Sequence, residues 1–164
     1  MIIIGIDPGI ATVGYGIIEC ITNKCRAIDY GPILTPANLS MPYRLDMIFE
    51  ELNKIIKYYK PHDMALEELF FNKNVKTAIT VGHARGVEIL SAVRNGLDIY
   101  EYTPLQIKQA VVGYGRADKK QVQYMVKTLL NLGDIPKPDD VADALAVAIC
   151  HSSSLKFKDL FLMK

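Results

Sequence analysis

The chain of 164 residues is 50% hydrophobic and 23% charged, which is typical of one folded domain and excludes a disordered or fibrous protein. Its net charge of +1 alone says nothing about a nucleic-acid partner. The apolar run over residues 1–6 stops at Asp7, too early for a signal peptide or a membrane span, so we expect a cytoplasmic protein with no membrane segment.

The first part of the chain predicts three strands. Residues 2–8, 13–20 and about 26–34 form apolar runs that are bounded by turn residues such as Thr22 and Asn23. The connections between them are short, and parallel strands need long crossovers. We therefore expect an antiparallel meander.

Helical and strand patterns then alternate. Apolar residues at helical spacing predict a helix that begins after Ser40 as N-cap and runs to about Tyr59. The later elements are expected as a strand at 62–67, a helix at 75–94, a strand at 98–102, a helix at 104–112, a helix capped by Asp118 and a last helix from near Pro138.

This order predicts an α/β fold with a mixed five-stranded sheet, in which the antiparallel meander is followed by parallel strands and helices cover both faces. It is the element order of the ribonuclease H-like fold. Gly82 and Gly86 share one predicted helix, and we interpret them as allowing close packing, either within the domain or across a dimer.

The three cysteines, Cys20, Cys25 and Cys150, form no CxxC pair, and their number is odd. A structural zinc site or a disulfide framework is therefore not expected. We interpret all three as reduced thiols, as is usual in the cytosol.

Acidic residues stand at the ends of three predicted elements. They are Asp7 at the end of the first strand, Glu67 and Glu68 after the strand HDMAL, and Asp139, Asp140 and Asp143 at the start of the last helix. Each cluster also has an ordinary explanation, because Asp-Pro-Gly favours a turn and acids favour the first turn of a helix. The pattern permits these carboxylates to meet but does not require it.

Carboxylates without a CxxC or HExxH motif suit hard, oxygen-binding cations such as Mg²⁺ or Mn²⁺. Two such ions about 4 Å apart can activate a water and stabilise the leaving oxygen of a phosphodiester. If the three clusters converge, the sequence predicts a metal-dependent hydrolase.

Basic residues gather in two segments, as a phosphate-binding surface requires. Residues 72–94 carry Lys73, Lys76, Arg85 and Arg94, and residues 105–127 carry Lys108, Arg116, Lys119, Lys120 and Lys127. Two solvated helix faces would give the same pattern.

Five blocks, in order from residue 1 to about residue 151, resemble the RuvC family of Holliday-junction resolvases. They are GIDPGIATVGYGII, ALEELFFNKN, GHARGVEIL, YTPLQIKQAVVGYGRADKKQVQYMV and KPDDVADALAVAICH. The resemblance implies a ribonuclease H-like nuclease domain over residues 1–152. It does not extend to the tail at 153–164, which stays unassigned.

The resemblance also implies an activity and its partners. A homodimer would nick four-way DNA junctions symmetrically during recombination and repair. Its cofactor would be Mg²⁺, with two ions per active site and Mn²⁺ as a possible substitute. The RuvA–RuvB branch-migration machinery would be its partner.

Residues carried over from the family match positions of this sequence. The catalytic, metal-binding acids are Asp7, Glu67, Asp140 and Asp143, and the DNA-binding residues are Phe70, Lys108, Arg116, Lys119 and Lys120. Glu68 and Asp139 become neighbours of the catalytic acids. The family also allows His at the position of Asp140.

Three alternatives stay open. Asp7-Pro8-Gly9 followed by Gly14 and Gly16 resembles the first phosphate loop of actin-like ATPases, although that family builds its cleft between two such halves. An RNA-directed or idle ribonuclease H-like protein is a second possibility, and the basic block at 105–127 argues against an idle one. A non-enzymatic DNA-binding module would have no reason to collect acids that repel phosphate.

Overall fold

The computed structural model describes residues 1–22, 24–69 and 75–164. The strands are β1 (Ile2–Asp7), β2 (Thr12–Ile21), β3 (Lys24–Leu34), β4 (Asp63–Glu67) and β5 (Asp98–Tyr102), and the helices are α1 (Met41–Tyr59), α2 (Val75–Arg94), α3 (Pro104–Val112), α4 (Lys119–Leu129), α5 (Asp139–Ser154) and the 3-10 helix η1 (Leu155–Phe161).

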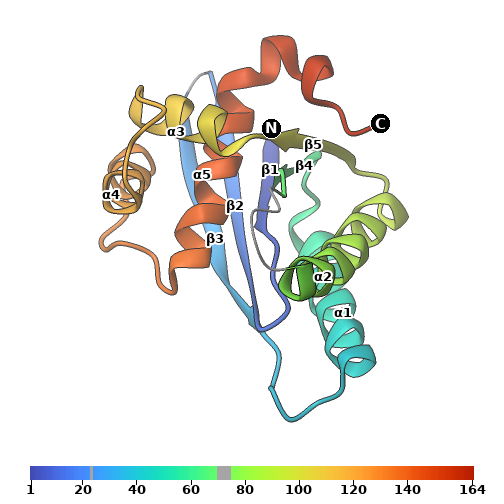
Figure 1. Cartoon of the computed structure of the whole chain (residues 1–164). Coiled ribbons are helices and arrows are strands. Elements are labelled where there is room, and N and C mark those ends of the chain that lie inside the picture. Colours follow the sequence, from blue (N-terminus) through green and yellow to red (C-terminus); the bar gives the residue numbers. More distant parts are fainter. Residues whose placement is uncertain (23, 70–74) are drawn as a thin grey trace.

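The strands form one sheet in the order β3-β2-β1-β4-β5. The pairs β1–β2 and β2–β3 are antiparallel, and the pairs β1–β4 and β4–β5 are parallel. Helices α3, α4 and α5 lie on one side of this sheet, and α1 and α2 lie on the other (Figure 1). The predicted α/β fold, a meander followed by parallel strands between two helical layers, is confirmed.

Side chains of β1 alternate between these two layers, as in any strand. Ile4 and Ile6 pack into the core on the side of α1 and α2, whereas Ile3 packs into the core that contains the buried face of α5. Asp7 has the same parity as Ile3 and therefore faces α5.

Three glycines bring α5 onto the sheet. A Cβ atom on Gly5 would lie 2.1 Å from the backbone oxygen of Ala144, and one on Gly14 would lie 2.0 Å from the backbone oxygen of Asp140. A Cβ on Gly16 would lie 2.5 Å from the Leu145 side chain. The helix backbone therefore rests directly on β1 and β2, closer than any strand with side chains would allow.

Cys20 and Cys25 form a disulfide, with their Cα atoms 4.1 Å apart. The expectation of three reduced thiols is therefore wrong for this pair, while Cys150 is free and buried. The two residues face each other in the β2–β3 hairpin. The Cys20 N–H donates to the carbonyl of Met1, next to β1, and therefore points away from β3. Cys20 and Cys25 thus form a non-hydrogen-bonded pair, the kind of antiparallel pair in which the two residues lie closer together.

The C-terminal tail packs against the domain. The boundary expected near residue 152 falls inside α5, and Lys158 of η1 donates to the buried carboxylate of Asp63 (2.9 Å). His151 Nε2 donates to the same Asp63 oxygen (2.9 Å), and its Nδ1 accepts from the Tyr102 hydroxyl (2.7 Å). Burial lowers the pKa of His151, so the neutral ring links β4 and β5 to α5.

Two helix starts match their predicted caps to different degrees. Asp118 accepts from the Gln121 N–H in a capping box, as predicted for α4. Ser40 occupies the N-cap position of α1, but its hydroxyl makes no capping hydrogen bond. No described helix is both long and apolar enough to cross a membrane.

Replacing Gly14 with Ala should lower stability by about 1–3 kcal/mol, because its methyl group would overlap the backbone of Asp140 and push α5 off the sheet. Gly133→Ala is the matched control, since nothing lies within 4 Å of its Cβ position. Urea unfolding of both variants measures the difference. Equal stability of the two variants would contradict this view of the α5 contact.

Candidate active site

Two of the predicted acids lie side by side at the carboxyl edge of the sheet. β1 and β4 pair in parallel from Ile3–Asp63 to Ile6–Leu66. One further step in this register brings Asp7 opposite Glu67, the last residue of each strand. Both side chains face α5, and the regular alternation turns Glu68 toward the other face, since its N–H continues the ladder to Tyr102.

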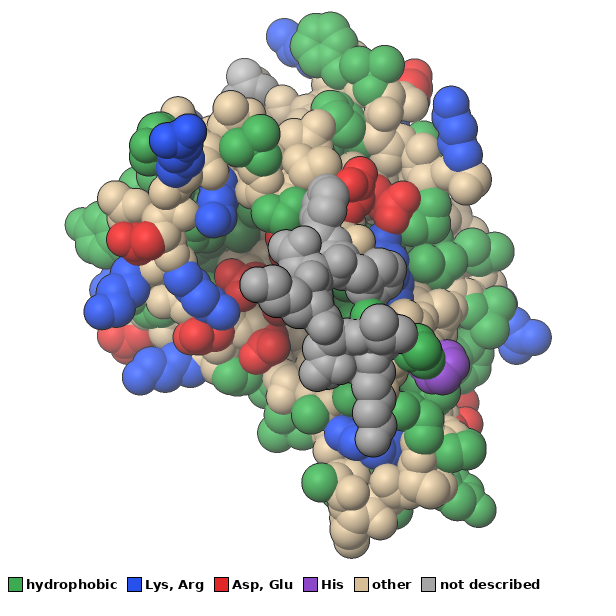
Figure 2. Space-filling view, viewed as in Figure 1, with side chains coloured by type: hydrophobic (Ala, Val, Ile, Leu, Met, Phe, Trp, Pro, Cys, Tyr) green, Lys and Arg blue, Asp and Glu red, His purple; other side chains and the backbone are tan. Residues whose placement is uncertain are grey.

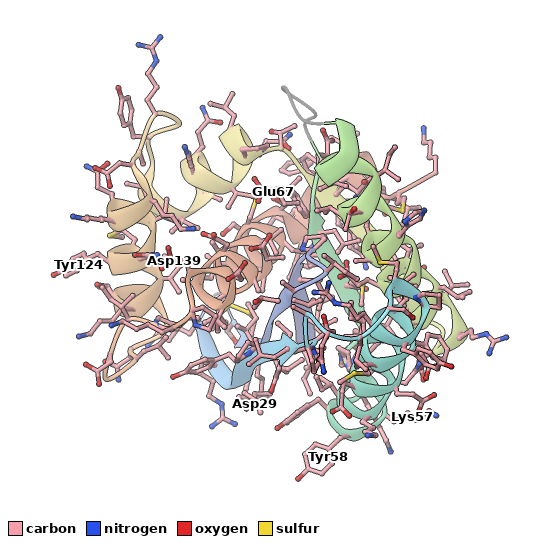
Figure 3. All side chains as sticks on the ribbon, turned by 60° about the horizontal axis from the view of Figure 1, so that its bottom comes forward. Asp29, Lys57, Tyr58, Glu67, Tyr124 and Asp139 are labelled. Carbon is pink, nitrogen blue, oxygen red and sulfur yellow. A yellow bond between two sulfur atoms is a disulfide. The ribbon has the colours of Figure 1, made fainter. Side chains whose placement is uncertain are left out.

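The start of α5 supplies the remaining acids. Asp140 and Asp143 both lie close enough to Asp7 to act on its charge. Asp139 instead turns to α4, where it accepts from the Gln123 amide (2.9 Å) and lies 3.4 Å from the Lys119 ammonium. Figure 3 shows Asp139 between α4 and α5.

The carboxylates of this group repel one another. Burial, together with the charges of Asp143, Asp140 and Glu67, raises the pKa of Asp7 from 3.8 to about 8. Burial also raises the pKa of Glu67 and of Asp143. A buried set of like charges is costly unless a cation balances it.

Two lysines face these carboxylates. Lys119 Nζ lies 3.1 Å from Asp143, and the positive charge of Lys108 partly offsets the burial that raises the pKa of Glu67. A pocket of about 210 Å³ opens between the two lysines, Glu67 and Asp143, and the other residues that line it are Pro104, Ile107, Val122 and Ala146. The lining of the pocket therefore combines charged and apolar side chains.

The remaining predicted DNA-binding residues differ in position. Arg116 and Lys120 are exposed on the α3–α4 side, where Figure 2 shows basic side chains gathered with acidic ones among them. Arg85 is buried and paired with Glu101, so it does not belong to a basic surface as its segment suggested. Phe70 and Lys73 lie outside the described residues.

The donors at this edge suit a hard divalent cation, since all four predicted ligands are carboxylates. As the side chains stand, no three Asp, Glu, His or Cys residues within 1–22, 24–69 and 75–164 lie close enough together to hold a metal ion. The Lys119 ammonium meets Asp143 there instead. Burial and the charges of Asp143, Asp140 and Glu67 raise the pKa of Asp7, and a cation bound beside these carboxylates would relieve their repulsion.

Sequence reasoning placed Arg85 of α2 on a basic surface and assigned no role to Glu88, and both residues lie near this edge. Both are buried, with 8% and 0% of their surface exposed. The available signal was their position on the apolar, core-facing side of the helix, where charged side chains are rare unless they are paired.

The fold and its acidic edge are those of a ribonuclease H-like nuclease. A family model described as "Crossover junction endodeoxyribonuclease RuvC" matches residues 3–151. Relatives of that description from Alkaliphilus oremlandii and Finegoldia magna are 61% and 62% identical over 164 residues, the whole of each chain. The chain therefore belongs to the RuvC family.

Solved structures agree with this assignment. RuvC of Thermus thermophilus in complex with a Holliday junction substrate is 32% identical, with a TM-score of 0.94 over 99% of each chain. The yeast mitochondrial Holliday junction resolvase Ydc2 shares the fold, with a TM-score of 0.66 at 14% identity over 96% of this chain and 82% of that one.

We expect Asp7→Asn to stabilise the metal-free protein. Because folding raises the pKa of Asp7 from 3.8 to about 8, the wild type loses stability as pH rises from about 4 to about 8, by on the order of a few kcal/mol. The uncharged Asn escapes this loss, so the melting temperatures of the two proteins in chelator should diverge as pH rises. Glu68→Gln, the neighbouring acid, is the control. A variant that melts at or below the wild type near pH 8 would contradict the repulsion.

Proposed function

We propose that this chain is an endodeoxyribonuclease that resolves four-way (Holliday) junctions in DNA by paired, metal-dependent hydrolytic nicks. The observation that carries the proposal is the convergence of acids from β1, β4 and α5 beside two lysines, in a chain of about 61% identity to crossover junction endodeoxyribonucleases. The activity belongs to recombination and repair, and the resemblance extends the proposal to RuvA–RuvB as its partner machinery.

The proposed metal ligands and catalytic acids are Asp7, Glu67, Asp140 and Asp143. Mg²⁺ is the proposed cofactor, two ions per site with Mn²⁺ as a substitute, and when bound it would supply an activated water and stabilise the leaving oxygen. Asp7 and Glu67 lie at the ends of β1 and β4. Asp140 and Asp143 lie at the start of α5, which packs directly on Gly14 of β2. The fixed backbone positions of these acids limit how far their side chains must move to bind the ions and to orient the reacting phosphodiester.

Lys108 and Lys119 are the proposed phosphate contacts nearest the scissile bond. Both line the pocket with Glu67 and Asp143, so a phosphate seated there meets positive charge beside the acids. Lys119 is half exposed and already paired with Asp143, hence it can exchange that partner for a phosphate at little cost. Arg116 and Lys120 are proposed to extend the contact along the DNA backbone.

The rival functions fit this chain less well. The relatives from Alkaliphilus oremlandii and Finegoldia magna align over their whole length with this chain, which folds around one five-stranded sheet. The cleft of an actin-like ATPase needs two such halves. The relatives named above are crossover junction endodeoxyribonucleases, which favours this function over an RNA-directed enzyme or a simple DNA-binding module.

We further propose a homodimer that forms through the open face of α2. This face presents Ile79, His83, Gly86, Leu90 and Val93 at helical spacing, and Ile79, Leu90 and Val93 are 56%, 48% and 60% exposed. Nothing lies within 4 Å of a Cβ built on Gly86, so a partner helix can approach its backbone closely. A junction with two symmetric scissile bonds matches a two-fold dimer with one site per subunit.

Asp7→Asn, Glu67→Gln and Asp143→Asn should each reduce junction cleavage by several orders of magnitude, since each removes a negative ligand at nearly constant shape. Junction binding should persist, because these acids repel phosphate. Cleavage and gel-shift assays on labelled four-way junction and matched linear duplex, with and without Mg²⁺, measure both. Glu68→Gln and Asp139→Asn are the milder controls; if either equals its catalytic neighbour, the assignment of the acids is wrong.

Lys108→Ala and Lys119→Ala should weaken junction binding and flatten the slope of log affinity against log salt by about one unit each. Lys57→Ala is the control, since this exposed lysine projects from α1, far from Glu67 and Asp139 (Figure 3). Binding isotherms over a range of salt concentrations give the slopes. An equal effect at Lys57 would remove any special role of the two pocket lysines.

Leu90→Glu should convert the dimer to a monomer, because the charge would be buried in the α2–α2 contact. Leu160→Glu is the control, since Leu160 is 78% exposed on η1. Light scattering gives the mass of each variant. A monomeric wild type, or a dimeric Leu90→Glu, would rule out this interface.

A further inference from the structure

Arg85 of α2 links the ends of β4 and β5. Its side chain, 10% exposed, projects from the middle of α2 on the face of the sheet opposite α5. One guanidinium nitrogen, Nη1, donates to the backbone carbonyl of Glu67 (2.8 Å), and the other, Nη2, forms an ion pair with Glu101 of β5. The fork of the guanidinium therefore spans the ends of β4 and β5.

Glu88 lies one helical turn further along the same face of α2. It is fully buried, and neither carboxylate oxygen makes a regular hydrogen bond to a described residue. Burial raises its pKa to about 8, while Arg85 and the nearby backbone N–H of Gly9 lower it. The Gly9 N–H thus lies close enough to act on the carboxyl electrostatically, although the two do not form a hydrogen bond of ordinary geometry.

Burying these two ionisable side chains in the core costs desolvation energy. A buried guanidinium needs acceptors for its N–H groups, and apolar side chains of similar size would pack there with less desolvation. The acceptor that Arg85 uses is the carbonyl of Glu67 itself, whose side chain lines the pocket on the opposite face. Arg85, on the α2 side of the sheet, is therefore bonded to the backbone of Glu67, whose side chain is a proposed metal ligand on the α5 side.

We propose that Arg85 is a positioning residue, which fixes the Glu67 carboxylate against Asp7 and Asp143 by holding the Glu67 backbone carbonyl. Its guanidinium contacts the Glu67 carbonyl and Glu101 on the α2 side of the sheet, so it would act only through Glu67. A lysine could not replace it, because a single ammonium lacks the rigid fork that reaches both the carbonyl and Glu101. This inference rests on the proposed function for its cleavage readout.

The experiment compares Arg85→Lys and Arg85→Met with Glu101→Gln. The Gln variant removes the ion pair but leaves Arg85 its bond to the Glu67 carbonyl, so it reports the purely structural loss. Each protein is measured for melting temperature, junction affinity without divalent metal, and single-turnover cleavage at saturating junction. The fourth measurement is the rise in melting temperature as Mg²⁺ is added without DNA.

All three variants should melt below the wild type. At a temperature where every protein is folded, the Arg85 variants should cleave about ten- to hundredfold more slowly, because small displacements of a catalytic group cost that much. Their junction affinity should match that of the wild type, and the Mg²⁺ needed for the melting shift should rise several-fold. Glu101→Gln should keep the wild-type rate and Mg²⁺ dependence.

Two results would overturn the proposal. One is an Arg85→Lys protein with a lower melting temperature but wild-type rate and Mg²⁺ dependence, and this variant decides if Arg85→Met does not fold. The other is a Glu101→Gln protein that loses as much activity as the Arg85 variants. Failure of the wild type to cut junctions would instead refute the proposed function, and the Mg²⁺ melting shift would still test Arg85.

Discussion

The structure depends on the direct contact between the backbone of α5 and the glycines of β1 and β2. Gly5, Gly14 and Gly16 leave no room for a side chain, so the backbone of α5 lies directly against the sheet. This contact brings Asp140 and Asp143 within electrostatic reach of Asp7. The raised pKa of Asp7 means that ionising this residue lowers the stability of the fold, and the packing of α5 against the sheet maintains the arrangement.

Much of the fold could be predicted because its signals are local. Hydrophobic periodicity and turn residues indicate the strands and helices, and the short connections of the meander against the long crossovers indicate the mixed sheet. The choice of Glu67 over Glu68 came from the family resemblance, and strand alternation gives it a physical reason. Likewise, the turn of Asp139 toward Gln123 separates it from Asp140.

The rest could not be predicted because it depends on pairings between distant segments. The Cys20–Cys25 disulfide follows from the register of a hairpin, and a count of cysteines contains no register. Arg85 looked like one member of a basic cluster until the Glu67 carbonyl and Glu101 were found around it. Charge in the sequence does not show which side chains are turned inward, so clustering predicted that both Lys119 and Arg85 lie on a basic surface, whereas Lys119 is exposed and Arg85 is buried.

The disulfide hairpin has a practical consequence for studying the protein. Within β2, Gly14 pairs with Asp7, whereas Cys20 is hydrogen-bonded to Met1 at the other end of β1. The cysteine pair therefore lies at the end of the sheet away from the acids. Cys150 is buried. After mild reduction, a fluorophore attached at Cys20 or Cys25 would therefore report on tumbling and assembly from a position away from the acids.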